Sequence, residues 1–171
     1  AVKRVLDLCT GSGCIAVAAA MTFPDASVDA TDIDQLALTL ADKNIAEYQL
    51  NDHINLIESD LYQNLSATYD LILSNPPYGP RGEIGLFPAE YQLEPAAAFD
   101  GGAYGLDLVH KILNGASAFL SDGGHIVVEV GESWTTLEEA YPKVPFNWLE
   151  TGVEDSGLFI MEKSELLKYF C

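Results

Sequence analysis

Hydrophobic and polar positions alternate along this 171-residue chain in blocks that favour strands and helices in turn. Short apolar runs that stop at polar or glycine-containing turns are typical of strands buried in a sheet. Longer stretches with apolar residues three and four positions apart are typical of helices. The predicted strands span residues 5–9, 26–31, 54–57, 69–74, 125–131, 144–149 and 158–162. The predicted helices span residues 16–21, 35–48, 106–120 and 134–141.

The order of these elements predicts one α/β domain over residues 1–171. Strands that alternate with helices pair in parallel, whereas the last two strands follow each other closely along the chain. We therefore expect a mostly parallel seven-stranded sheet with an antiparallel closing hairpin. Residues 79–105 form the longest segment without a predicted element, and such segments are usually lids, binding loops or disordered chain.

The helix predicted at residues 35–48 has a local start signal. Asp34 precedes it and is expected to cap its first turn, because an aspartate oxygen accepts hydrogen bonds from the free N–H groups there. Apolar residues at helical spacing are expected to form its inward face: Leu36, Leu40 and Ile45.

The chain carries a formal net charge of −18, with only eight lysine and arginine residues scattered along it. No basic patch is available to neutralise phosphates, so the composition disfavours direct nucleic-acid binding by this domain. An acidic surface favours a basic protein partner through electrostatic steering. No apolar run reaches the length needed to cross a membrane, so we expect no membrane partner.

The three cysteines, Cys9, Cys14 and Cys171, are an odd number without metal-ligand spacing. We therefore expect neither a disulfide framework nor a metal site, but buried, reduced thiols in a cytoplasmic protein. The chain enters its first predicted strand almost at once, so we expect no signal peptide. We interpret it as a catalytic domain without an N-terminal portion.

A glycine-containing turn joins the first predicted strand to the first predicted helix. Gly11 and Gly13 allow positive φ and close approach of a ligand, and the helix behind them offers unpaired N–H groups. A strand, a glycine turn and a helix in this order bind nucleotide cofactors in open α/β sheets. Asp32 ends the next strand about twenty residues later, where an acid can hold ribose hydroxyls.

Asp60 follows the third predicted strand. A carboxylate at this place could meet the exocyclic amine of an adenine. An aspartate that merely caps a turn is an equally good interpretation of the local sequence.

The fourth predicted strand runs directly into Ser74-Asn75-Pro76-Pro77-Tyr78. Two consecutive prolines lack backbone N–H groups, end the strand and keep Asn75 extended. The carboxamide of Asn75 and the carbonyl of Pro76 are therefore left at the strand end as acceptors for a ligand. Asn-Pro alone would indicate a plain strand-terminating turn.

Taken together, these residues resemble the protein glutamine N5-methyltransferases, which use S-adenosylmethionine on the Rossmann-like fold of class I methyltransferases. The matching stretches run from end to end of the chain: Asp7 to Gly13, Asp32, Asp60-Leu61, Asn75 to Tyr78 and Glu94-Pro95. The family also carries a helical N-terminal domain that helps to recognise the substrate, and this domain is absent from the chain. Residues 79–82 depart from the more acidic segment expected after the Asn75 to Tyr78 motif.

The family has two bacterial branches, one that acts on peptide-chain release factors and one that acts on the third protein of the large ribosomal subunit. Residues 10–15, 101–107 and 141–150 resemble the ribosomal branch, and the last stretch is the most specific. The resemblance therefore implies methylation of a glutamine side-chain amide in a basic ribosomal protein.

The resemblance also implies roles for individual residues, with S-adenosylmethionine as cofactor, S-adenosylhomocysteine as product and no metal. Gly11 and Gly13 approach the methionine end, Asp32 binds the ribose, and Asp60 and Leu61 flank the adenine. The full cofactor-binding set is Asp7, Cys9, Thr10, Gly11, Ser12, Gly13, Asp32, Asp60, Leu61 and Asn75. The catalytic set that holds the substrate glutamine is Asn75, Pro76, Pro77 and Tyr78.

Three alternatives remain open at this point. A nicotinamide dehydrogenase fits the glycine turn and Asp32 but leaves the Asn75 to Tyr78 motif unexplained. A methyltransferase that acts on adenine or guanine amino groups uses a similar motif, but it needs a cationic surface that this chain lacks. A non-enzymatic binding module is disfavoured because both the cofactor acids and the substrate motif are present.

Overall fold

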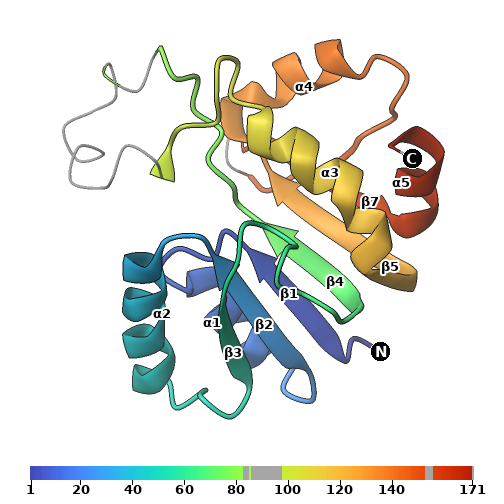
Figure 1. Ribbon diagram of the computed structural model, residues 1–171. Helices are drawn as coiled ribbons and strands as arrows, with labels where there is room; N and C mark the ends of the chain where they lie inside the picture. The colour runs from blue at the N-terminus through green and yellow to red at the C-terminus, as the bar shows by residue number, and fades with distance from the viewer. Residues whose placement is uncertain (83–84, 86–97, 153–155, 171) are drawn as a thin grey trace.

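The computed structural model describes residues 1–82, 85, 98–152 and 156–170. Within these residues the chain forms a seven-stranded sheet in the order β3-β2-β1-β4-β5-β7-β6 (Figure 1). The strands are β1 (Arg4–Leu8), β2 (Ser27–Asp32), β3 (Ile54–Glu58), β4 (Tyr69–Ser74), β5 (Leu120–Glu129), β6 (Asn147–Trp148) and β7 (Leu158–Glu162). The α-helices are α1 (Cys14–Thr22), α2 (Gln35–Glu47), α3 (Asp107–Phe119), α4 (Trp134–Ala140) and α5 (Lys163–Tyr169).

The sheet is parallel from β3 to β5 and antiparallel at its closing edge. β1 pairs in parallel with both β2 and β4, and β5 pairs in parallel with β4. β7 runs antiparallel to both β5 and β6. The predicted mostly parallel sheet with a closing hairpin is therefore confirmed. The chain leaves β1 toward β2 on one side and returns to β4 on the other, so the strand order reverses between β1 and β4. Ligands of open α/β sheets bind at the carboxyl ends of strands beside such a reversal.

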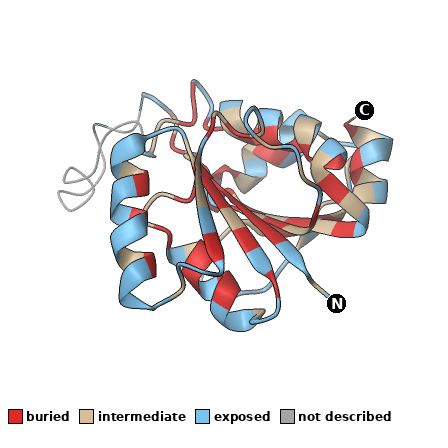
Figure 2. Cartoon of the chain, turned by 60° about the horizontal axis from the view of Figure 1, so that its bottom comes forward, coloured by how far each residue is buried: buried red, intermediate tan, exposed pale blue. Residues whose placement is uncertain are grey.

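Helices cover both faces of the sheet, and each face has its own core. Val5 of β1 packs in the cluster that contains residues of α1 and α2. Leu6 and Leu8 of the same strand pack in the cluster that contains residues of α3, α4 and α5. Successive side chains of a strand point to opposite faces, so a strand covered on both sides is a continuous hydrophobic run. Figure 2 shows the buried residues concentrated along these strands and on the helix faces turned toward them.

Helix α2 begins as predicted but turns a different face inward. Asp34 caps it, because its side chain accepts a hydrogen bond from the Leu36 N–H at 2.9 Å. The predicted inward residues Leu36 and Leu40 are 77% and 49% exposed, so that prediction is wrong for both. The residues that are buried are Leu38, Ala41 and Ile45. The reason is a close approach: a Cβ on Gly13 would lie 3.0 Å from the Cβ of Ala41, so only a small residue fits at that contact.

The carboxyl-terminal third differs from the prediction at three elements. β5 starts at Leu120 instead of residue 125, and its pairing with β4 shifts register between Tyr69 and Leu71. The strand predicted at residues 144–149 is reduced to Asn147–Trp148. Helix α5 was not predicted, although Glu162 and Glu165 form a capping box at its start. No helix in the described part of the chain is long and apolar enough to cross a membrane.

Candidate active site

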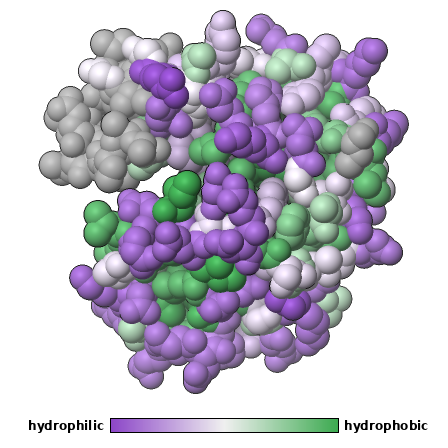
Figure 3. Space-filling model, viewed as in Figure 1, coloured by the Kyte–Doolittle hydropathy of each residue, from purple (hydrophilic) through white to green (hydrophobic). Residues whose placement is uncertain are grey.

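Most of the predicted site residues meet at the carboxyl ends of β1, β2, β3 and β4. Register pairs Leu8 of β1 with Ser74 of β4, and the Ser74 hydroxyl donates a 2.9 Å hydrogen bond to the Leu8 carbonyl. The glycine turn and Asn75 therefore leave the sheet from adjacent strands. Figure 3 shows hydrophobic side chains exposed among polar ones on this side of the molecule.

The two glycines of the turn are required for different reasons. Gly11 has φ 56°, and a Cβ placed on it would have nothing within 4 Å, so space is open for a ligand beside its backbone. Gly13 has φ 81° and faces Ala41 of α2, so its role is helix packing. The side chain of Asn44 donates a 2.8 Å hydrogen bond to the Ser12 carbonyl and holds the turn against α2. Cys9 also has positive φ, 60°, which is rare outside glycine.

Asp32 lies at the end of β2 with both carboxylate oxygens fixed. Oδ2 accepts the Gly11 N–H at 2.8 Å, and Oδ1 accepts the Asp34 N–H at 2.9 Å. The side chain is half-buried, and each oxygen keeps a lone pair for another donor. This carboxylate is a prepared acceptor for a pair of hydroxyl groups.

Asp7 is fully buried beneath the glycine turn. Its Oδ2 accepts a hydrogen bond from the Thr10 hydroxyl, whereas Oδ1 has no hydrogen-bond partner in the described part of the chain. Burial is the main cause that raises the pKa of Asp7 from 3.8 to about 7, and the charge of Asp32 adds to it. The Thr10 hydroxyl and the backbone N–H of Ala16 lower this pKa, although the Ala16 N–H does not reach Oδ1 in hydrogen-bond geometry.

Three carboxyl groups act electrostatically on the half-buried thiol of Cys9. Burial, and after it the charges of Asp32, Asp7 and Asp60, raise the pKa of Cys9 to about 12. The prediction of a buried thiol is wrong for Cys14, which is exposed at the start of α1, and Cys171 lies outside the described residues. Negative charge gathered around Cys9 is complementary to a cationic ligand.

The turn after β3 is stabilised by hydrogen bonds between its own residues. The buried Ser59 hydroxyl donates to the Leu61 carbonyl at 2.8 Å and accepts the Asn64 N–H at 3.1 Å. Leu61 is buried with φ 51°. The Asp60 carboxylate accepts one long contact, 3.3 Å, from the Gln63 side chain. It therefore contributes little to the turn through its side chain and remains available to a ligand.

Ile33 lies at this edge of the sheet but was not predicted as a site residue from the sequence. It stands between Asp32 and Asp34 and is 67% exposed. A large apolar side chain between two acids directly after a strand is a signal that could have been used, because ligands of open α/β sheets bind at the carboxyl ends of the strands.

The Asn75 to Tyr78 motif follows β4 as predicted. Asn75 is exposed, and no described residue hydrogen bonds to its carboxamide. Tyr78 is half-buried against the end of β5. The chain after it is ordered by a parallel bridge, in which Gly79 donates to the Phe99 carbonyl at 2.8 Å and accepts from the Gly101 N–H at 2.9 Å. The ends of the 79–105 segment are therefore fixed, while Glu94-Pro95 lies outside the described residues.

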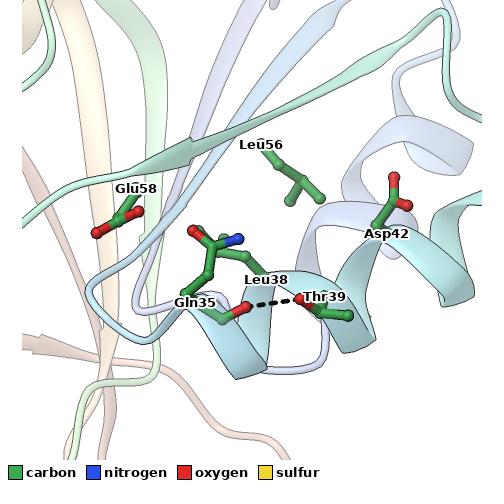
Figure 4. Close-up of a pocket in the computed structure, with 6 residues that line it drawn as sticks. All are labelled: Gln35, Leu38, Thr39, Asp42, Leu56 and Glu58. Carbon is green, nitrogen blue, oxygen red and sulfur yellow. Dashed lines mark hydrogen bonds between the residues drawn. The ribbon is translucent and has the colours of Figure 1, made fainter.

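A separate pocket of about 290 Å³ lies between α2 and β3, at the outer edge of the sheet (Figure 4). Its lining is Gln35, Leu38, Thr39, Asp42, Leu56 and Glu58. None of these residues was predicted to belong to the site. Glu58 is the register partner of Asp32, and this strand pairing is the link between the pocket and the site. In the described residues, no group of three or more His, Cys, Asp and Glu side chains is arranged to hold a metal ion.

A family model described as methyltransferase small domain matches residues 1–91, just over half of the chain. The chain belongs to this methyltransferase family. The match includes every predicted site residue from Asp7 to Tyr78. The fold is shared with an O-methyltransferase of Brevibacillus brevis that was solved in complex with S-adenosyl-L-homocysteine and is 16% identical, with a TM-score of 0.51 over 75% of this chain.

Curated relatives agree with the resemblance that the sequence motifs indicated. A ribosomal protein uL3 glutamine methyltransferase of Neisseria gonorrhoeae is 46% identical over 166 residues, which are 97% of this chain and 56% of the relative. The enzyme of the same name from Francisella tularensis is 42% identical over 169 residues, which are 98% of this chain and 54% of the relative. The chain therefore spans about half the length of the curated relatives that it matches.

Solved structures agree with the fold. TrmN from Thermus thermophilus is 29% identical, with a TM-score of 0.65 over 94% of this chain and 43% of its own. The prediction of a class I methyltransferase fold is confirmed.

Proposed function

We propose that this chain transfers a methyl group from S-adenosylmethionine to the side-chain amide nitrogen of a glutamine in ribosomal protein uL3. The observation that carries the proposal is the exposed carboxamide of Asn75, which is bonded to no described residue at the end of β4. A plain strand-terminating turn would use that side chain as a cap. The names of the curated relatives support the reaction and the substrate.

The residues at the strand ends fit the cofactor. Open space beside Gly11 admits the methionine end, and Asp7, which is bonded to Thr10 of the same turn, has one buried oxygen without a hydrogen-bond partner among the described residues. The three carboxyl groups around Cys9 favour the positive charges of the sulfonium and ammonium groups. S-adenosylmethionine supplies a methyl group that is already activated by its sulfonium leaving group.

The adenosine end has acceptors and an apolar contact. Asp32 is fixed as an acceptor for the two ribose hydroxyls. Asp60 is available to accept the exocyclic amine of the adenine. Ile33 and Leu61 offer apolar contacts to the ring, which would remove the exposed surface of Ile33 from water.

Asn75 and Pro76 position the substrate. An amide nitrogen is a poor nucleophile because its lone pair is delocalised into the carbonyl. Asn75 Oδ1 and the Pro76 carbonyl accept the two N–H bonds of the glutamine amide, orient the nitrogen and stabilise the positive charge that develops on it. Positioning and electrostatic stabilisation of this kind supply about 3–4 kcal/mol per preorganised group. Pro77 and Tyr78 keep the loop on its path.

The protein partner is inferred from charge and from length. A net charge of −18 steers a basic protein to the surface and repels nucleic acid. We further infer that residues 1–171 are the catalytic domain, and that the remaining length of the relatives includes a helical domain that recognises the substrate. That division explains how a small catalytic domain selects one glutamine.

A direct assay tests the proposal. The protein is incubated with S-adenosylmethionine and either purified uL3 or a peptide-chain release factor, and the digested products are analysed by mass spectrometry. We expect one added methyl group on a single glutamine of uL3. Methylation of the release factor alone would assign the other branch. Methylation of neither protein by full-length enzyme that binds the cofactor would contradict the proposal.

A further inference from the structure

Tyr78 is held by the turn that follows β5. Its hydroxyl donates a 3.3 Å hydrogen bond to Oε1 of Glu129, the last residue of β5. Its backbone carbonyl accepts a 2.9 Å hydrogen bond from the hydroxyl of Ser133, which is buried. Pairing of β4 with β5 places Ser74 opposite Val128, so Glu129 lies beside the start of the Asn75 to Tyr78 motif.

Two glycines make room for this tyrosine. A Cβ on Gly131 would lie 2.5 Å from Cε2 of the Tyr78 ring, and a Cβ on Gly105 would collide with the Tyr78 carbonyl oxygen. Both glycines have positive φ, so a larger residue would be strained as well as crowded. The turn is also tied to β7, because the Val130 N–H donates to the Gly157 carbonyl at 2.8 Å. The tyrosine therefore rests against a rigid support.

The motif needs such a support because it cannot hold itself. Pro76 and Pro77 have no backbone N–H and form no sheet bonds through nitrogen. On the side of β4, the Ser74 hydroxyl fixes the motif to the Leu8 carbonyl at 2.9 Å. On the other side, the first fixed residue is Tyr78. The path of Asn75 and Pro76 is thus set by these two attachments.

We propose that Glu129 is a positioning residue for methyl transfer, which acts by fixing the Tyr78 side chain and so the direction of the Asn75 carboxamide and the Pro76 carbonyl. The inference rests on the proposed function, since it concerns the same substrate motif. In the described part of the chain, the Tyr78 hydroxyl is the only hydrogen-bond donor to the Glu129 carboxylate. Glu129 is half-buried and is paired in register with the apolar Leu158. Partial burial of its carboxylate costs desolvation energy, and the pairing of the strands does not require a charged residue at this position.

The variants Glu129→Ala, Glu129→Gln, Tyr78→Phe and the double variant Glu129→Ala/Tyr78→Phe test this role. Misplacement of a reacting group by about 1 Å can cost 10²-fold, so Glu129→Ala is expected to lower kcat on uL3 by about 10- to 100-fold. The glutamine variant keeps an oxygen that accepts the tyrosine hydroxyl and should restore most of the rate. Tyr78→Phe should cost about as much as Glu129→Ala, and the double variant no more than either single change.

Binding and folding are measured beside the rate. Affinity for S-adenosylmethionine, KM for uL3 and Tm should stay close to those of the unsubstituted chain, because the proposed role of Glu129 is exerted through Tyr78 and not on either ligand. Glu132→Ala is the matched control, since Glu132 is an exposed acid in the same turn. Additive losses in the double variant, no rescue by glutamine, or a loss of rate that only follows a loss of folded protein would overturn the proposal.

Nuclear magnetic resonance separates this inference from the proposed function. Glu129→Ala is expected to shift the signals of the Asn75 side-chain NH₂ and the Gly79 backbone N–H, and Glu129→Gln much less. If the chain methylates neither uL3 nor a release factor, the proposed function fails while these signals still report on the support of the motif. Unchanged signals in Glu129→Ala would overturn the role of Glu129 whatever the substrate is.

Discussion

The carboxylate of Asp32 accepts a 2.8 Å hydrogen bond from the backbone N–H of Gly11, although 21 positions separate the two residues. This bond joins the glycine turn after β1 to the end of β2. Its geometry is set by the fold, so the proposed acceptor for the ribose and the backbone proposed to lie beside the methionine end are placed relative to each other in advance. Preorganisation lowers the entropic cost of binding a ligand that touches both.

Asp32→Ala removes both the proposed ribose acceptor and the bond that holds Gly11. We expect weaker binding of S-adenosylmethionine by about 1–3 kcal/mol, the range for a lost hydrogen bond to a charged group. Isothermal titration calorimetry measures this binding free energy. Asp52→Ala is the control, because this exposed aspartate lies in a turn and its substitution makes the same change in charge. Equal affinity in the two variants would rule out the role of Asp32.

Asn75→Ala removes the side-chain acceptor but leaves both prolines, so the loop should keep its path. Loss of one preorganised polar group at a reacting centre lowers turnover by about 10²–10³-fold. We expect that loss in single-turnover methylation, with cofactor affinity and Tm nearly unchanged. The exposed Asn51 provides the control substitution Asn51→Ala. An early melt combined with near-normal turnover per folded molecule would show that Asn75 only caps the strand.

Asp7 predicts an unusual dependence of stability on pH. Because burial raises its pKa from 3.8 to about 7, the folded state binds the proton more tightly than the unfolded state does. The stability from this group is complete below about pH 3.8 and is lost as pH rises to about 7.

Asp7→Asn should escape this loss, because the amide has no charge to bury. Between acid and neutral pH, the free energy of unfolding of Asp7→Asn is expected to rise relative to that of the unsubstituted chain. The expected change is a few kcal/mol, the free energy that corresponds to the pKa shift of Asp7. Urea unfolding at several pH values measures the difference, with Asp52→Asn as the control. Parallel pH curves for the chain and Asp7→Asn would refute the prediction.

The thiols of Cys9 and Cys14 should differ in reactivity. Burial and nearby carboxylates raise the pKa of Cys9 to about 12, so almost none of it is thiolate at neutral pH. Cys14 is exposed. Alkylation with iodoacetamide followed by peptide mapping should label Cys14 well before Cys9, and saturating S-adenosylhomocysteine should slow Cys9 further. Faster labelling of Cys9 would place its side chain in solvent instead.

The signals that worked in the sequence were local ones. Gly11, Asp32 and Asn75 each follow a short apolar strand, and parallel strands bring their carboxyl ends to one edge without further information. Asp34 was likewise predicted to cap α2 from its position directly before the helix, and its side chain does so. The structure confirms that these residues lie at one edge of the sheet, whereas their roles in a site stay predictions.

The failures came from contacts between distant segments. The inward face of α2 depends on Ala41 meeting Gly13, which no periodicity in residues 35–48 reveals, so Leu36 and Leu40 were placed wrongly. The contact of Glu129 with Tyr78 could not be predicted from the local sequence, because it depends on the pairing of β5 with β4. Tertiary packing decides such positions, and propensity does not.

The short strand β6 has a consequence for association between molecules. An edge strand offers its unpaired N–H and C=O groups to any other extended chain, and long apolar edges promote aggregation. Asn147 and Trp148 leave a template only two residues long, and Pro145, two positions before Asn147, has no N–H to offer. At the β6 side of the sheet, another extended chain therefore finds almost no edge on which a fibril could grow, which leaves the five-residue strand β3 at the opposite side as the longer edge.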